Sequence, residues 1–132
     1  VTTLIYNREG YVITWVPMNG RKQRERGFNQ SELISRYLSK KTGIPCRRLL
    51  REKRGSGTQR TLGLRDRFIH SLGRYQAAGT GIRGVRTVLI VDDICTTGAT
   101  LNECARQLRL AGFDRVFSLT IARTDIKRLE KF

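Results

Sequence analysis

Runs of apolar residues predict the strands of a sheet. "YVITWV" is rich in β-branched and aromatic residues and stands between Gly10 and Pro17, which are turn residues. "TVLIVDD" is apolar without interruption over four residues, as is typical of a strand that is covered on both faces. The strands predicted in this way cover residues 11–16, 44–50, 87–93 and 115–122.

Apolar residues spaced by three and four positions predict two helices. The first covers residues 29–41, with Asn29 as N-cap and Glu32 three positions later, in the pattern of a capping box, and it ends at Gly43. The second covers residues 100–111 and ends at Gly112. The side chains predicted to face the core are Leu33, Ile34, Tyr37 and Leu38 in the first helix, and Leu101, Ala105 and Leu108 in the second.

Strands therefore alternate with helices along the chain, which predicts an α/β fold with a mostly parallel, twisted sheet flanked by helices. Residues 17–27 and 51–60 are polar, basic and glycine-containing, and both are predicted to be loops. Residues 64–72 are compatible with a short helix or an irregular segment, and the pattern does not choose between them. The charged residues 123–132 are compatible with a frayed terminal helix.

Length and composition indicate one folded domain over residues 1–132. No apolar run approaches the ~20 residues of a membrane-spanning helix. Three widely spaced cysteines and one histidine argue against a zinc site within the chain and against a disulfide framework. We expect a cytoplasmic protein, because no signal peptide is evident and the cysteines are unpaired in the sequence pattern.

The positive charge is concentrated in one half of the chain. The net charge is +15, and residues 21–86 hold 18 Lys and Arg residues against four acidic residues. Such an excess indicates an anionic partner, namely a phosphate ester, nucleic acid or a membrane surface. The alternative is a basic surface that only keeps the protein soluble.

The segment "VLIVDDICTTGATL" carries the most specific chemistry. Asp92 and Asp93 end a strand, where ligands of open α/β sheets bind, and such acids accept hydrogen bonds from ribose hydroxyls or hold Mg²⁺ through water. Residues 95–100 join this strand to a helix whose first N–H groups form an anion site. Together these features predict a sugar-phosphate site. The alternative is that the acids and threonines are only cap and turn residues.

The same segment resembles the phosphoribosyl pyrophosphate (PRPP) motif of type I phosphoribosyltransferases, in which two acids precede a threonine- and glycine-containing phosphate loop. Two further segments, "VPMNGRKQRERGFNQSELIS" and "LLREKRGSGTQRTLGLRDR", resemble the ComF/GntX family, which is associated with DNA uptake in natural competence. The resemblance covers roughly residues 12–123. It implies the Rossmann-like type I phosphoribosyltransferase fold. The cysteine-rich, zinc-binding module with which members of this family usually begin is absent from this chain.

The resemblance also implies roles for individual residues. Asp92 and Asp93 would hold the ribose hydroxyls, and Mg²⁺ would be bound together with PRPP. The 5-phosphate would be held by Thr96, Thr97, Gly98, Ala99 and Thr100, and the pyrophosphate by Met18, Asn19, Gly20 and Arg21. Catalytic roles would fall to Asp92, Asp93, Arg51 and Lys53, the last two in a mobile hood over the site.

The sequence and the resemblance are compatible with two functions and do not choose between them. The first is a Mg²⁺-dependent phosphoribosyltransferase that uses PRPP and an unidentified acceptor. The second is a non-catalytic module of the same fold that binds single-stranded DNA through its basic face. The cations predicted to contact DNA are Arg21, Arg24, Arg26, Arg54 and Arg60. Family membership further implies competence-apparatus proteins as partners, and a homodimer is compatible with it.

Overall fold

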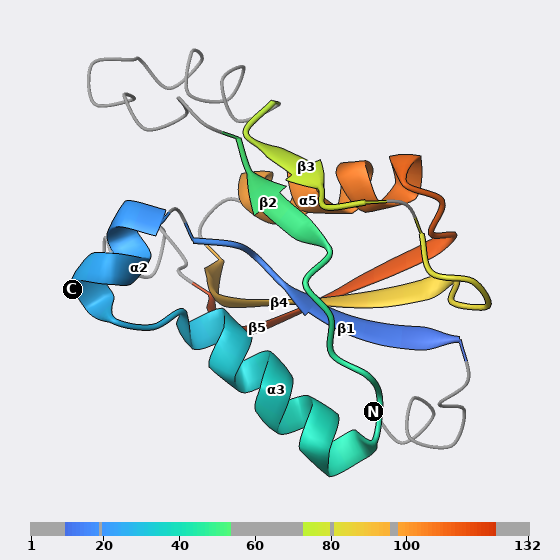
Figure 1. Cartoon of the computed structure of the whole chain (residues 1–132), viewed down its shortest axis with the longest axis horizontal. Coiled ribbons are helices and arrows are strands. Elements are labelled where there is room, and N and C mark those ends of the chain that lie inside the picture. The colour runs from blue at the N-terminus through green and yellow to red at the C-terminus, as the bar shows by residue number, and fades with distance from the viewer. Residues whose placement is uncertain (1–9, 19, 54–72, 80, 96–97, 124–132) are drawn as a thin grey trace, which may run out of the picture.

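The computed structural model describes residues 10–18, 20–53, 73–79, 81–95 and 98–123 (Figure 1). Five strands and three helices are found in these ranges. In chain order they are β1 (Tyr11–Trp15), α2 (Gly20–Arg26), α3 (Gln30–Thr42), β2 (Leu50–Glu52), β3 (Tyr75–Ala77), β4 (Thr87–Cys95), α5 (Ala99–Leu110) and β5 (Arg115–Arg123).

The central sheet is parallel and has the order β1-β4-β5. A further parallel bridge joins Ile13 to Cys46, through hydrogen bonds of 2.9 Å from Ile13 N to the Pro45 carbonyl and from Arg47 N to the Ile13 carbonyl. The chain segment around Cys46 therefore extends the sheet beyond β1. Strands β2 and β3 pair with each other in a separate antiparallel hairpin.

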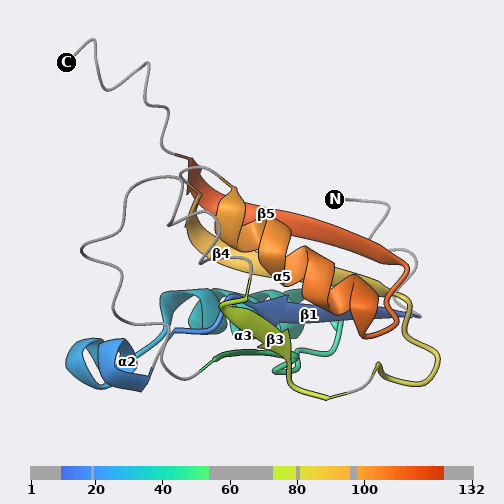
Figure 2. The same ribbon diagram turned by 90° about the horizontal axis from the view of Figure 1, so that it is seen from above.

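Helices cover the two faces of the sheet, α3 on one side and α5 on the other (Figures 1 and 2). Alternate strand residues point to opposite faces, so each face has its own core. On the α5 side Val12, Val88 and Ile90 pack with Leu101, Cys104 and Leu108, and the hairpin adds Leu50 and Tyr75. On the α3 side the buried residues are Ile13, Ile44 and Val91, against which Ile34 and Leu38 pack. The predicted α/β fold with a parallel sheet is confirmed.

Four predicted elements are confirmed within two residues at their ends. These are the strands at 11–16, 87–93 and 115–122 and the helix at 100–111. The helix at 29–41 is confirmed together with its caps: the Asn29 side chain accepts a hydrogen bond from Ser31 N, and Gly43 at φ 77° ends the helix. No helix among the described residues is long and apolar enough to cross a membrane.

The predicted loop at residues 17–27 is wrong over most of its length, because residues 20–26 form helix α2. Its sequence, GRKQRER, lacks apolar spacing but consists largely of residues with high helix propensity. Gly27 at φ 80° ends the helix, and its N–H donates to the Gln23 carbonyl at 2.7 Å.

Helix α3 does not bury the face that its apolar spacing predicts. Ile34 and Leu38 pack against the core, but Leu33 and Tyr37 are 53% and 60% exposed. The residues that α3 buries fully are Ser31 and Ser35. Small side chains allow the helix to lie close to β1: the Ser35 hydroxyl lies 3.4 Å from the Thr14 carbonyl of β1, and it also donates to the Ser31 carbonyl of its own helix at 2.8 Å.

The predicted strand at 44–50 is also wrong as a continuous element. The chain forms only the bridge at Cys46 and then enters β2 at Leu50. Pro45 lacks an N–H group and therefore cannot donate a hydrogen bond to a neighbouring strand, which interrupts regular strand pairing at this position. Residues 51 and 52, predicted as loop, belong to β2, and the three-residue strand β3 was not predicted. Residues 54–72, with the rest of that loop and the undecided segment, lie outside the described residues.

Candidate functional site

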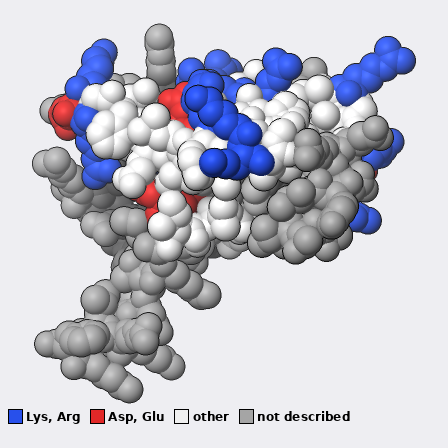
Figure 3. Space-filling model, turned by 90° about the horizontal axis from the view of Figure 1, so that it is seen from below, with Lys and Arg blue, Asp and Glu red and all other residues white. Residues whose placement is uncertain are grey.

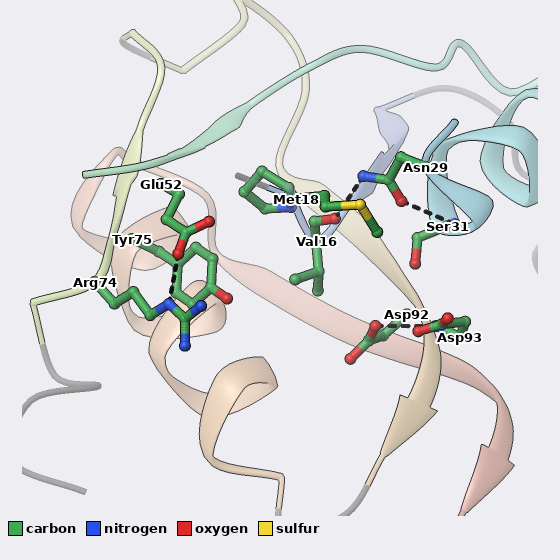
Figure 4. Close-up of a pocket in the computed structure, with 10 residues that line it drawn as sticks. Val16, Met18, Asn29, Ser31, Glu52, Arg74, Tyr75, Asp92 and Asp93 are labelled. Atoms are coloured by element: carbon green, nitrogen blue, oxygen red, sulfur yellow. Dashed lines mark hydrogen bonds and ion pairs between the residues drawn. The ribbon is translucent and has the colours of Figure 1, made fainter. Parts of the chain in front are cut away.

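The strand order places a ligand crevice between β1 and β4. From β1 the chain moves through α3 to the segment at Cys46, and from β4 it moves through α5 to β5, on the opposite face and in the opposite direction. Ligands of open α/β sheets bind at such a switch point, beyond the carboxyl ends of the strands. A cavity of about 130 Å³ opens there (Figure 4). It is lined by Val16, Pro17, Met18, Asn29, Ser31, Glu52, Arg74, Tyr75, Asp92 and Asp93.

Both predicted acids line this cavity. They follow the buried residues Ile90 and Val91 of β4, and both are partly buried. The Asp93 N–H donates to Asp92 Oδ1 at 2.9 Å. Burial, together with the Asp93 carboxyl, raises the pKa of Asp92 to about 6, although the Asp93 N–H and the Ser31 hydroxyl act in the opposite direction. Asp92 is therefore a carboxyl group that ionises close to neutral pH.

The start of α3 forms the wall beside the acids. Asn29 is only 4% exposed and holds two elements together: its Nδ2 donates to the Val16 carbonyl at 3.2 Å, and its Oδ1 accepts from Ser31 N at 3.0 Å. The cap thus fixes the amino end of α3 to the carboxyl end of β1. The sequence pattern predicts Asn29 as a cap, but it shows neither the place of Asn29 in the site nor that of Ser31.

The β2–β3 hairpin forms another wall. Arg74 Nε donates to Glu52 Oε1 at 2.6 Å, and the Arg74 guanidinium lies 5.6 Å from the centroid of the Tyr75 ring. Burial raises the pKa of Tyr75 to about 12, so its hydroxyl stays protonated at neutral pH. Glu52, Arg74 and Tyr75 are site residues that the sequence does not predict.

Arg51 and Lys53, the predicted hood cations, are exposed and are not among the residues that line the cavity. Strand β2 explains the difference, because successive side chains point to opposite sides. Leu50 is buried and Glu52 faces the cavity, whereas Arg51 lies opposite Gln76 of β3. The alternation with Leu50 is the signal in the sequence that identifies Glu52 as inward-facing.

The two predicted phosphate loops start from the same edge of the sheet. In the first, Met18 lines the cavity, Gly20 and Arg21 begin α2, and Asn19 lies outside the described residues. In the second, Gly98 caps α5 in a left-handed conformation at φ 78°, which favours glycine, and its carbonyl accepts from Asn102 N at 2.8 Å. Ala99 and Thr100 begin α5, and Thr96 and Thr97 lie outside the described residues.

The predicted DNA-binding cations are only partly described. Arg24 and Arg26 are exposed on α2, and Arg21 belongs to the same helix. Arg54 and Arg60 lie outside the described residues. Figure 3 shows Lys and Arg side chains spread over the face on which α3 lies, and few acidic side chains among them.

Asp92 and Asp93 suit Mg²⁺ only when the phosphates of a ligand supply further oxygen ligands. In the described ranges no three His, Cys, Asp or Glu side chains converge as a metal site. Mg²⁺ is usually held by one or two carboxylates together with substrate phosphates and water. Asp92 and Asp93 fit that mode, because both carboxyl groups line an open cavity.

Comparison with known proteins identifies the family. The family model named phosphoribosyl transferase domain matches residues 27–131, which is most of the chain. The chain belongs to the phosphoribosyl transferase domain family. Within this family it is 34% identical over 110 residues to Competence protein F of Haemophilus influenzae, a match that covers 82% of this chain and 48% of that protein.

Two further relatives support the ComF resemblance of this phosphoribosyl transferase domain. Identity is 33% over 104 residues to Competence protein ComFC of Bacillus subtilis, with 79% of this chain and 40% of that protein covered. It is 33% over 117 residues to the DNA utilization protein YhgH of Escherichia coli K12, with 85% and 49% covered. The resemblance to the ComF family is confirmed. The chain spans about half the length of these curated relatives or less.

Solved structures confirm the fold of the phosphoribosyl transferase domain. A purine phosphoribosyltransferase from Pyrococcus horikoshii superposes with a TM-score of 0.52 at 17% identity, covering 92% of this chain and 66% of that one. An allosteric regulatory enzyme of purine biosynthesis superposes with a TM-score of 0.54 at 23% identity, covering 83% and 21%. The predicted type I phosphoribosyltransferase fold is therefore correct.

Proposed function

We propose that this chain binds PRPP with Mg²⁺ in the cavity between β1 and β4 and acts as a phosphoribosyltransferase in DNA uptake. The observation that carries the proposal is the meeting of Asp92 and Asp93 with Met18, at the switch point of the sheet. The family match supports the sugar-phosphate ligand, and the names of the competence and DNA utilization relatives support the process.

In this reaction a nucleophile of the acceptor forms a bond to the anomeric carbon of PRPP. The bond from that carbon to pyrophosphate breaks, and pyrophosphate leaves with the electron pair. Asp92 and Asp93 accept hydrogen bonds from the ribose hydroxyls and hold the ring in place, and the amino end of α5 binds the 5-phosphate. Mg²⁺ supplies charge neutralisation for the leaving group.

Thermal unfolding tests the binding step. A ligand at 100 times its dissociation constant stabilises the folded state by about 2.7 kcal/mol, which corresponds to a rise of roughly 10 °C in Tm for a domain of this size. We expect that rise with PRPP and Mg²⁺, and a clearly smaller one when EDTA replaces Mg²⁺. An unchanged Tm at millimolar PRPP and Mg²⁺ would contradict the proposal.

A second candidate function is binding of single-stranded DNA by the basic half of the chain. The observation that favours it is the exposure of Arg24 and Arg26 on α2, within a segment that holds 18 Lys and Arg residues against four acids. Cations on a surface release counterions from DNA phosphates, which gives affinity without sequence preference. The two functions are compatible, since Arg24 and Arg26 are not among the residues that line the cavity.

Fluorescence anisotropy with a labelled oligonucleotide tests this second function. For single strands the slope of log K against log salt is about −0.7 per phosphate contact. Replacing both residues, Arg24→Gln and Arg26→Gln, should make that slope less steep by roughly 1.4 if each contacts one phosphate. Arg109→Gln, an exposed cation of α5, is the matched control. Equal slopes for the two variants would exclude α2 from the interface.

A further inference from the structure

The described lining of the cavity contains one positively charged side chain. Three carboxyl groups line it, those of Glu52, Asp92 and Asp93, and Arg74 is the cation among them. A ligand that carries several negative charges needs cationic donors in such a surrounding. Among the described lining residues, Arg74 is therefore the side chain that can bind an anionic group.

Two contacts hold the Arg74 side chain in one orientation. Its Nε donates to Glu52 Oε1 at 2.6 Å, and its guanidinium lies over the Tyr75 ring at 5.6 Å. The main chain is fixed separately, because the Arg74 carbonyl accepts from Lys53 N at 2.7 Å. The Glu52 side chain is 6% exposed and that of Arg74 is 23% exposed. A guanidinium carries five N–H donors, and Nε supplies only one of them to Glu52. The side chain is fixed before any ligand binds, so binding costs little side-chain entropy.

The guanidinium and the loop after β1 bound the same cavity. Figure 4 shows Arg74 and Tyr75 on one side of it, and Met18, Asn29 and the two aspartates on the other side. Guanidinium groups bind phosphates through two parallel hydrogen bonds, which a lysine cannot reproduce. Arg74 therefore lies across the cavity from both the proposed ribose site and the loop after β1, where its guanidinium can meet a pyrophosphate group that extends from the ribose into the cavity.

We propose that Arg74 binds the pyrophosphate group of PRPP and that Glu52 orients it. This inference rests on the proposed function, because it requires PRPP to bind in this cavity. Arg74 thereby replaces Arg51 and Lys53 as the cation that the β2–β3 hairpin contributes to the described site.

Titration calorimetry with three ligands tests the proposal: PRPP, inorganic pyrophosphate and ribose 5-phosphate, each with Mg²⁺. Loss of a hydrogen bond to a charged group weakens binding about 10- to 100-fold. For Arg74→Met we expect that loss for PRPP and for pyrophosphate, and a change of less than about twofold for ribose 5-phosphate. Arg74→Lys should fall between Arg74→Met and the wild type, because it keeps the charge but not the paired donors.

Two results would overturn the proposal. Equal weakening of ribose 5-phosphate and PRPP would show that Arg74 only supports the fold, and unchanged binding of PRPP and pyrophosphate would show that it contacts neither. A wild type that binds PRPP while Arg74→Met binds it equally well refutes this inference alone. A wild type that does not bind PRPP refutes the proposed function as well.

A second variant keeps the test informative if Arg74→Met does not fold. Glu52→Gln retains an oxygen that accepts from Arg74 Nε and removes one negative charge beside the pyrophosphate. We therefore expect PRPP to bind at least as tightly as to the wild type. PRPP binding weakened about tenfold, with an unchanged Tm, would contradict the proposal.

Discussion

Asp92 combines a strand position with an unusual ionisation. A carboxyl group at the end of a buried strand, beside a second carboxyl group, loses solvation and gains a like charge. Its pKa of about 6, against an ordinary value of 3.8, means that it is largely protonated at pH 5 and ionised at pH 7. Because the folded-state value is raised, ionisation of Asp92 alone lowers the unfolding free energy as pH rises from about 4 to above 6.

This ionisation predicts a pH dependence of PRPP binding. Ribose hydroxyls donate to the carboxylate form, so the apparent affinity scales with the ionised fraction of Asp92. Between pH 5 and pH 7 we expect a gain of about tenfold. Asp92→Asn should bind more weakly and lose this part of the dependence, while the titration of the ligand's own phosphates remains in both proteins. Parallel pH profiles for the two proteins in calorimetry would contradict the role of Asp92.

Asn29 is the residue on which two elements depend. Its acceptor caps α3 and its donor satisfies the Val16 carbonyl. Loss of a cap costs about 1 kcal/mol, and an unsatisfied buried carbonyl adds about 1–3 kcal/mol. We expect Asn29→Ala to lower the unfolding free energy in urea by about 2–4 kcal/mol. Asn29→Ser, which keeps a cap acceptor, should cost less, and equal losses for the two variants would show that the cap contributes nothing.

Helix α3 shows what apolar spacing alone does not reveal. The pattern marks a wide face from Leu33 to Leu38, but the helix is turned so that serines meet the sheet. The exposed part of that face borders Leu119 and Ile121 of β5 and Phe28 before the helix, in an apolar groove. Spacing identifies the helix correctly, whereas the close approach to β1 selects small side chains for the contact.

Because α3 presents serines and not leucines to the sheet, we expect a substitution at Ser35 to cost more stability than one at Leu33. Ser35 is completely buried, so Ser35→Leu forces extra volume against β1 and should cost about 1–3 kcal/mol. Leu33 is 53% exposed, so Leu33→Gln should stay within about 0.5 kcal/mol. The unfolding free energies of both variants, measured in urea, test this expectation. A larger loss for Leu33→Gln than for Ser35→Leu would mean that α3 presents its apolar face to the sheet.

Element length and periodicity explain which elements the sequence predicts. The strands at β1, β4 and β5 and the helices α3 and α5 carry clear apolar patterns, and all five are predicted. Helix α2 is polar on all sides, and β2 and β3 have three residues each, so neither kind offers a pattern to detect. The pairing of β2 with β3 forms only in the folded chain, whereas α2 reflects the helix propensity of its residues.

At the scale of the whole molecule, the site is a product of topology. Asp92 and Asp93 are predicted because they end a strand that the sequence shows, whereas Met18 is predicted only through the family resemblance. Ser31, Glu52 and Arg74 reach the same cavity from α3 and from the hairpin, at separations of tens of residues. No local pattern connects them, since the doubly wound sheet and the hairpin packed on α5 bring them together.

The central claim is that this cavity binds PRPP through its two aspartates. Calorimetry of PRPP with Mg²⁺, on the wild type and on the double variant Asp92→Asn/Asp93→Asn, tests it most directly. The variant keeps the shape of both side chains and removes both charges. We predict saturable binding of one PRPP per chain by the wild type and a loss of at least about 100-fold in the variant, since each charged hydrogen bond is worth about 1.5–3 kcal/mol. Equal affinity for the two folded proteins, or no binding by either, would contradict the claim.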